Sequence, residues 1–174
     1  MDNMLKDCKT YYGAIDIGSN AVRLLIKCVE EDEQGKVFFS KVLLLRVPLR
    51  LGFDVFAMGK ISETKEKNML RLMKVFHHLM KIYDVEDYRA CATSAMRDAK
   101  NGKDIIKRIK KKTGIRIEII DGQEEAKMIY NNHIECMEDR NGNYMYVDVG
   151  GGSTEINLLS QGELVCSRSY NIGT

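Results

Sequence analysis

An internal repeat constrains this sequence more than any other feature. Residues 12–26 (YGAIDIGSNAVRLLI) align without a gap with residues 144–158 (YMYVDVGGGSTEINL), 132 positions later. Both copies carry an Asp-x-Gly inside the same alternation of apolar residues. A duplication of this kind indicates two related structural units, each of which opens with a strand, a tight turn and a second strand.

The pattern of apolar residues predicts an α/β fold. The expected elements are strands at 11–18, 21–30 and 36–47, a helix that Ser62 caps, a strand at 88–94, a helix at 102–113 ended by Gly114, a strand at 115–120 and a helix at 121–137. Three short-turned strands followed by alternating strands and helices predict a mixed sheet, in which an antiparallel meander is extended by parallel strands and covered by helices.

The repeat also suggests where the units divide. We expect residues 1–137 to form one complete domain, and residues 144–174 to form only the opening meander of a second, truncated domain. The polar segment 138–143 is expected to be the turn between them. A three-stranded meander without a covering helix exposes an apolar face, so either the chain is a fragment of a longer protein or another element covers that face; a fragment is expected.

Composition excludes several classes of protein. Hydrophobic residues make up 44% and charged residues 30%, and no apolar run approaches the ~20 residues of a membrane span. No secretory signal precedes the first strand, so a cytoplasmic location is expected. The net charge of +2 favours neither nucleic acid nor membrane as a partner. The basic run 107–116 is interpreted as a solvated helix end, and steering of a polyanion is the alternative.

Two residue types that often bind metals are interpreted as structural. The five cysteines are scattered without a C-x-x-C pair, which favours reduced thiols over disulfides or a zinc site. His77 and His78 lie in the long helix without a second cluster of ligands nearby, so packing or surface roles are expected for both.

The two repeated turns have the composition of anion-binding loops. A Gly-rich turn at a strand end lets successive backbone N–H groups point at one anion. The residues expected to bind phosphate are Gly18, Ser19 and Asn20 in the first copy and Gly150, Gly151, Gly152, Ser153 and Thr154 in the second. Asp16 and Asp148 precede these turns and would repel a phosphate unless Mg²⁺ lay between them, so both are expected to be metal ligands. Either turn alone is equally well explained as a plain hairpin.

A third anion site is expected where the strand at 88–94 ends. Thr93 and Ser94 hydroxyls, the N–H groups of a following helix and the Arg97 guanidinium could converge on a phosphate. Helix capping by Thr93 or Ser94, with Arg97 on the surface, explains the same residues equally well.

Two adjacent glutamates follow in the segment DGQEEA. Asp121 at the N-cap places Glu124 at the capping-box position, which gives Glu124 a structural task. Glu125 lies about 100° further round the helix and is the freer residue for orienting a water and accepting its proton.

Five motifs occur in one order: AIDIGSNAVRLLI, RLG, ATSAMRDAKN, DGQEEA and VDVGGGSTEI. Together they resemble the exopolyphosphatase / guanosine pentaphosphate phosphohydrolase family, whose members have two ribonuclease H-like domains of the actin-like ATPase superfamily. The resemblance implies Mg²⁺-dependent hydrolysis of a terminal phosphate from inorganic polyphosphate or guanosine pentaphosphate. It implies that Glu125 is the catalytic base and that Asp148 and Glu155 surround the metal and the nucleophilic water. It also implies that Arg97 binds phosphate and that the full-length protein is a homodimer.

Two other functions remain open from the sequence. One is a small-molecule kinase on the same fold, which would need an adenine pocket in the absent half. The other is a non-catalytic module that binds polyphosphate or alarmone. Three retained carboxylates, at Glu125, Asp148 and Glu155, argue against pure anion binding.

Overall fold

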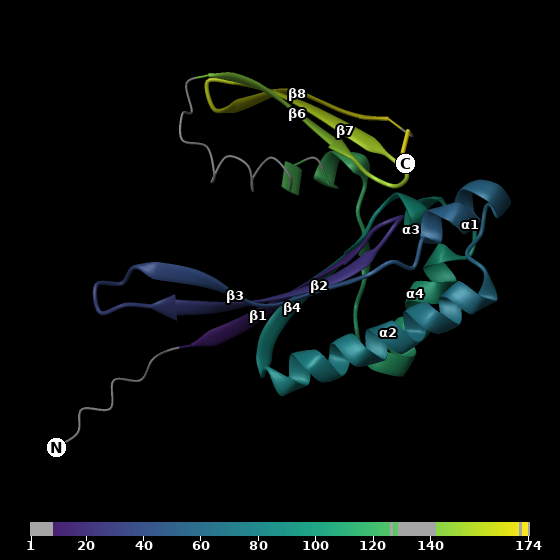
Figure 1. Ribbon diagram of the computed structural model, residues 1–174, viewed down its shortest axis with the longest axis horizontal. Coiled ribbons are helices and arrows are strands. Elements are labelled where there is room, and N and C mark those ends of the chain that lie inside the picture. The colour runs from purple at the N-terminus through teal and green to yellow at the C-terminus, as the bar shows by residue number, and fades with distance from the viewer. Residues whose placement is uncertain (1–8, 126, 129–141, 171, 174) are drawn as a thin grey trace.

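The fold is described from a computed structural model, which defines residues 9–125, 127–128, 142–170 and 172–173. Two β-sheets form separate layers, and helices α2 and α4 cover the side of the first sheet that faces away from the second (Figure 1). The first sheet has the strand order β3-β2-β1-β4-β5, and the second has the order β6-β7-β8. The cleft between the two layers is where the repeated turns meet.

The first sheet is mixed, as the sequence predicts. Its strands are β1 (Thr10–Ile17), β2 (Val22–Glu31), β3 (Val37–Val47), β4 (Val85–Ala92) and β5 (Glu118–Ile119). Strands β1, β2 and β3 form an antiparallel meander, whereas β4 and β5 add in parallel. Strand β5 is shorter than the predicted strand at 115–120. Ile115 and Ile117 are buried in the core, but only two residues of this segment pair with β4.

Helices α2 (Glu63–Ile82) and α4 (Gly102–Thr113) cover one face of this sheet. Helices α1 (Leu51–Met58) and α3 (Ser94–Asp98) lie at the end of the sheet, where the Gly52 N–H donates to the Ser19 carbonyl and the Thr93 N–H donates to the Ile17 carbonyl. Met69, Met73 and Phe76 of α2 are fully buried in the core that also contains residues of β1, β2 and β4, because residues three and four apart share one helix face. The predicted caps are confirmed: the Ser62 hydroxyl accepts from the Lys65 N–H, and Gly114 ends α4 in the left-handed conformation.

Helix α1 has no counterpart among the predicted elements. It buries Leu51 and Val55 and leaves two phenylalanines outside. Asp54 is also buried, where it forms an ion pair with Lys65 at 2.7 Å and accepts from the Ser62 N–H at 3.0 Å. Contacts with the first residues of α2 therefore hold α1 in place. No local sequence pattern predicts these contacts.

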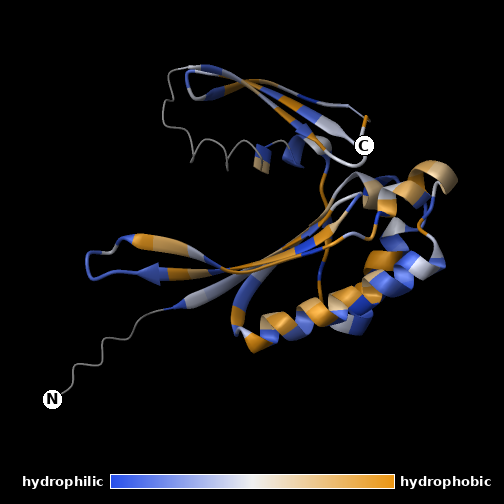
Figure 2. Ribbon diagram, in the orientation of Figure 1, coloured by the Kyte–Doolittle hydropathy of each residue, from blue (hydrophilic) through white to orange (hydrophobic). Residues whose placement is uncertain are grey.

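The second sheet repeats the first meander. Its strands are β6 (Asn143–Val149), β7 (Thr154–Ser160) and β8 (Glu163–Tyr170). Val147 and Val149 are 50% and 55% exposed, whereas their repeat partners Ile15 and Ile17 are buried. Figure 2 shows apolar residues alternating with polar ones along these strands. The division of the chain into domains at 1–137 and 144–174 stays a prediction.

Several smaller expectations concern the surface. Most side chains of the basic run 107–116 are exposed, as predicted, and Lys110, Lys111 and Lys112 lie in the last turn of α4. Among the described cysteines, Cys28, Cys91 and Cys166 are free thiols. None of the helices in the described ranges has both the length and the apolar character needed to cross a membrane. Most of the turn predicted at 138–143 and most of the helix predicted at 121–137 lie outside the described residues, and Asn143 belongs to β6.

Candidate functional site

The two repeated turns have the same geometry, residue for residue. In the first, Asp16 pairs with Arg23 across β1 and β2, and the Gly18 N–H donates to the Ala21 carbonyl at 3.0 Å. In the second, Asp148 pairs with Glu155, and the Gly150 N–H donates to the Ser153 carbonyl at 2.8 Å. The pairing of β2 with β3 shifts its register after Ile26, and the pairing of β7 with β8 shifts after Leu158, the repeat partner of Ile26. The duplication is therefore one of structure as well as of sequence.

The turns come into direct contact, which requires glycine at two positions. A Cβ atom on Gly151 would lie 3.0 Å from the Asn20 Cβ. A Cβ atom on Gly152 would lie 2.7 Å from the Ser19 Oγ and 2.8 Å from the Ser94 Oγ, closer than ordinary contacts allow. Ser19 and Ser94 are buried and hydrogen-bonded to each other at 2.7 Å. Three segments that are distant in sequence thus meet at one point.

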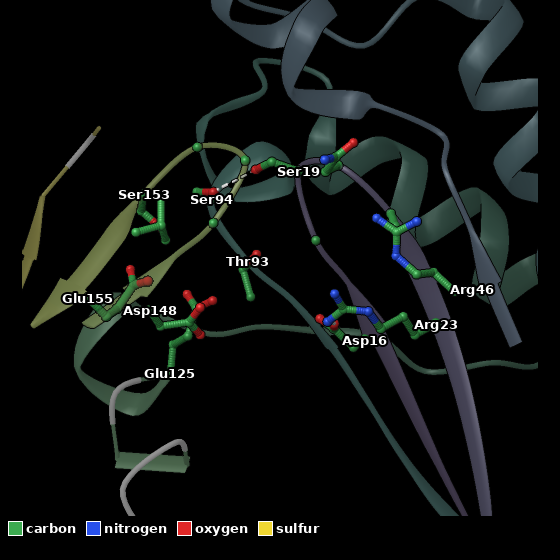
Figure 3. A pocket seen from close by; sticks show the side chains of 17 residues that line it. Asp16, Ser19, Arg23, Arg46, Thr93, Ser94, Glu125, Asp148, Ser153 and Glu155 are labelled. Carbon is green, nitrogen blue, oxygen red and sulfur yellow. Dashed lines mark hydrogen bonds and ion pairs between the residues drawn. The ribbon is translucent and has the colours of Figure 1, made fainter. Parts of the chain in front are cut away.

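A cavity of about 270 Å³ opens between the two turns (Figure 3). It is lined by Asp16, Gly18, Ser19, Asn20, Ala21, Arg23, Arg46, Thr93, Ser94, Glu125, Asp148, Val149, Gly150, Gly151, Gly152, Ser153 and Glu155. The lining includes most of the residues predicted from the sequence to bind phosphate or metal or to act in catalysis. Its surface is mainly polar, as an anion-binding cleft requires.

Glu125 reaches the cavity from the start of a helix. Asp121 caps this helix, since its carboxylate accepts from the Glu124 N–H at 2.8 Å and its carbonyl accepts from the Glu125 N–H at 3.0 Å. The capping position predicted for Asp121 is confirmed. The Glu124 carboxylate instead binds the Arg89 guanidinium at 2.6 Å, outside the cavity. Glu124 therefore has a structural task, and Glu125 is left free to face the cleft.

Burial and nearby negative charges disfavour the ionised form of the Glu125 carboxyl. Its Oε2 is buried and has no hydrogen-bond partner among the described residues. Burial, followed by the negative charge of Glu155, raises its pKa from 4.5 to about 7. Arg97 opposes this shift, and Asp16 and Asp148 add to it. A carboxyl with a pKa near neutrality can exchange a proton at physiological pH.

Glu155 is held in place by its neighbouring strand. It is 2% exposed, and one carboxylate oxygen, Oε1, accepts a hydrogen bond from the Ser169 hydroxyl of β8 at 2.9 Å. Ser169 itself fits closely against Gly122, where an added Cβ would lie 2.9 Å from the Ser169 Cβ. Strand β8 thus fixes both Glu155 and the first turn of the helix that carries Glu125.

The two predicted metal ligands differ in their surroundings. Asp16 is bound to Arg23 at 3.1 Å, and burial raises its pKa although Arg23 opposes the effect. Asp148 is exposed to the cavity and faces Glu125. Within the described ranges, no group of three or more His, Cys, Asp or Glu side chains is arranged to hold a metal ion.

Two predicted phosphate ligands do not line the cavity. The Arg97 Nη1 donates to the Ile120 carbonyl at 3.1 Å, and its Nε lies 3.6 Å from Asp98. The Thr154 hydroxyl donates to the Ile172 carbonyl at 2.6 Å. In this structure Arg97 contributes positive charge near Glu125, and Thr154 connects the second turn to Ile172, which follows β8.

Two arginines in the lining are absent from the predicted site. Arg23 pairs across the turn with Asp16, and Arg46 pairs with Arg23 across β2 and β3. The turn itself could have revealed Arg23, because antiparallel pairing places it opposite Asp16. Arg46 required the register of the third strand, which the sequence does not fix.

Comparison with known proteins places the chain among phosphatases. A profile of the Ppx/GppA phosphatase family matches residues 28–174. The bifunctional 3-dehydroquinate synthase/phosphatase of Fusobacterium nucleatum is 32% identical over 164 residues, 92% of this chain and 25% of that protein. Exopolyphosphatase 1 of Mycobacterium tuberculosis is 28% identical over 144 residues, 83% of this chain and 41% of that protein.

Solved structures give the same result. The Aquifex aeolicus member of the Ppx/GppA family is 30% identical with a TM-score of 0.79, and the alignment covers 95% of this chain and 52% of that one. An exopolyphosphatase from Cytophaga hutchinsonii is 28% identical with a TM-score of 0.84, over 94% of this chain and 51% of that one. These matches show that the chain has the fold of the solved Ppx/GppA structures, which is the fold that the resemblance implies. The chain spans between a quarter and about half the length of these four relatives. The family profile covers most of its residues, and the chain belongs to the Ppx/GppA phosphatase family.

Proposed function

We propose that this chain forms the catalytic cleft of a Mg²⁺-dependent phosphoanhydride hydrolase that acts on inorganic polyphosphate, guanosine pentaphosphate or both. The observation that carries the proposal is Glu125, whose buried, unpartnered carboxylate oxygen and pKa of about 7 occur between two glycine turns. The choice of substrates follows the family resemblance, and the relatives include exopolyphosphatases.

The charges of the cavity orient the substrate. Figure 3 shows Glu125, Asp148 and Glu155 gathered on one side, and Arg23 and Arg46 on the other. A phosphate chain is attracted to the arginines and to the backbone N–H groups of the turns, and is repelled by the three carboxylates. The terminal phosphate therefore lies between the turns, and a water lies on the carboxylate side, in line for attack.

Mg²⁺ fits this arrangement on the carboxylate side. Asp148 is the accessible ligand, and Asp16 could join it only by releasing Arg23 in part. The ion would neutralise negative charge on the phosphate oxygens. Phosphate oxygens and waters would complete its coordination, as they commonly do for Mg²⁺ at phosphoryl-transfer sites.

The reaction follows from these positions. Glu125, in its ionised form, accepts a proton from the attacking water while the water oxygen bonds to the terminal phosphorus. The bond between that phosphorus and the bridging oxygen breaks, and the shortened chain leaves as an anion. Backbone N–H groups of the turns, with Arg23 and Arg46, stabilise the charge that moves onto the departing oxygens. Orthophosphate carries away the oxygen of the water.

The decisive experiment measures phosphate release with Mg²⁺ from medium-length polyphosphate and from guanosine pentaphosphate. Glu125→Gln should reduce turnover by at least about a hundredfold, since general-base catalysis contributes about 10²–10⁴, and should leave polyphosphate affinity nearly unchanged. Glu124→Gln is the matched control, because Glu124 is the preceding residue and faces Arg89. Turnover by Glu125→Gln equal to that of the control would refute the assigned base. If the unmodified chain binds neither substrate, the proposed function fails as a whole.

A further inference from the structure

A cationic surface lies on the helical side of the first sheet, whereas the catalytic cleft opens on the other side (Figure 1). The acidic residues of α2 and α4 all lie in the first turns of these helices, where Glu66 pairs with Arg108 at 2.6 Å. Positions 67–82 and 105–113, which follow, contain basic residues but no acidic residue. Most of the length of both helices therefore carries positive charge that no carboxylate of the same segment balances.

Basic side chains of the two helices converge on a hollow between them. This α2–α4 hollow measures about 390 Å³. Its ionisable lining residues are Lys74, His77 and His78 of α2 and Lys111 and Lys112 of α4. None of the residues that line it is acidic, and none of its lysines forms an ion pair within the described part of the chain. An anion that entered the hollow would therefore meet unpaired cations from two helices.

The helix dipole explains only part of this cluster. Lys111 and Lys112 lie in the last turn of α4, where cations stabilise the negative end of a helix. Lys74 and His77 lie in the interior of α2, where no helix end is present. Burial, the positive charge of Lys81 and the neighbouring His78 lower the pKa of His77 below its ordinary value. The fold therefore maintains a repulsion between cations that a bound anion would relieve.

The chemistry of the lining favours an inorganic phosphate chain over other polyanions. Lysine ammonium groups bind phosphate as compact point charges. The hollow is lined by no Phe, Tyr or Trp side chain of the described residues on which the bases of a single-stranded nucleic acid could stack. Its described lining also lacks a carboxylate that could hold a metal ion or accept a proton from water, which distinguishes it from the catalytic cleft. An anion bound there would be held without hydrolysis.

We infer that the α2–α4 hollow binds a run of phosphate groups in an inorganic polyanion, at a second site that is separate from the catalytic cleft. Lys74 approaches this anion from α2, and Lys111 and Lys112 approach it from α4, so their ammonium groups neutralise adjacent phosphate groups. Ring N–H groups of His77 and His78 supply further hydrogen-bond donors. The inference does not rest on the proposed function, because no residue of the cleft takes part in it.

NMR spectroscopy of the histidine rings tests this site directly, because the chain contains three histidines and two of them line the hollow. Inorganic tripolyphosphate, a short phosphate chain, is titrated into the full chain at constant ionic strength without divalent cations. The ring resonances of His77 and His78, assigned with His77→Gln and His78→Gln, should shift in a saturable manner. Bound phosphate should also raise the pKa of His77, since a nearby negative charge favours the protonated ring. Resonances of both histidines that stay unchanged throughout the titration would overturn the inference.

A matched pair of variants separates the site from the net charge of the protein. Lys111→Gln/Lys112→Gln should weaken the binding that the histidine resonances report at least about threefold, since two exposed charge pairs are lost. The control is Lys103→Gln/Lys110→Gln, which removes equal charge from exposed positions of the same helix that do not line the hollow. Equal weakening by the two double variants would overturn the inference.

Two further titrations separate this site from the cleft and from another ligand. Glu125→Gln should leave the histidine titration unchanged, because Glu125 lines the cleft. A titration that is lost in Glu125→Gln would place the anion in the cleft and overturn the second site. An oligothymidylate that binds the hollow more tightly than tripolyphosphate, measured by the same resonances, would assign the surface to single-stranded nucleic acid and overturn the inorganic ligand.

Discussion

Ionisation of Glu125 should lower the free energy of unfolding of this protein, and replacement of the carboxyl by an amide in Glu125→Gln should restore it. The carboxyl has a pKa of about 7 in the folded chain, against its ordinary value of 4.5. Between these two pH values the folded chain binds more protons than the unfolded chain, so the free energy of unfolding falls as the pH rises. Below pH 4.5 the group is protonated in both states and the penalty is absent. Above pH 7 the penalty is fully present.

The size of the penalty follows from the same shift. A tenfold change in proton affinity corresponds to about 1.4 kcal/mol, which places the ceiling at about 3 kcal/mol. Glu125 is partly accessible to solvent, and solvent screening lowers the effect, so we expect Glu125→Gln to gain about 1–2 kcal/mol at pH 8.5. The same variant should gain almost nothing at pH 4.5, because glutamine then replaces an uncharged carboxyl.

Urea denaturation without divalent cations, at pH 4.5 and pH 8.5, measures this difference directly. Glu124→Gln is again the control, since it removes an exposed ion pair with Arg89 and should not stabilise the chain at either pH. A Glu125→Gln variant that is no more stable than the unmodified chain at pH 8.5 would refute the assignment of a buried, repelled carboxylate. An equal gain at both pH values would show that the gain has another cause.

Two further predictions concern the core and the basic side of the cleft. Phe76→Ala should lower the free energy of unfolding by about 3–5 kcal/mol because Phe76 is fully buried, whereas Val75→Ala, at a 49% exposed neighbour, should change it by about 0.5 kcal/mol or less in urea denaturation. Similar losses for the two variants would contradict the packing of α2. Arg46→Gln should weaken tripolyphosphate binding about threefold in calorimetric titration, since one partly screened cation is lost from the cleft. The control is Arg116→Gln, because Arg116 is exposed and does not line the cleft. If both variants weaken tripolyphosphate binding equally, Arg46 acts only through the net charge of the protein.

The sequence predicted the parts of this protein that depend on neighbouring residues. Strand alternation and Gly-containing turns fixed the two meanders, and their repeat placed Asp16 and Asp148 at equivalent positions before the turns. The caps at Ser62, Asp121 and Gly114 were also predictable, because each depends on hydrogen bonds within one turn of helix. The same local reasoning separated Glu124 from Glu125.

Only the tertiary structure decided which of these residues act together. Arg97 donates to the Ile120 carbonyl in the folded chain, and its role as a phosphate ligand stays a prediction, whereas Arg46 enters the cleft through the register of an edge strand. The pKa of Glu125 depends on burial and on Glu155, which lies 30 positions further along the chain. Such effects arise from the packing of distant segments, and packing is set by the whole core. The sequence therefore determined the two turns and their carboxylates, and the fold determined that they face one another.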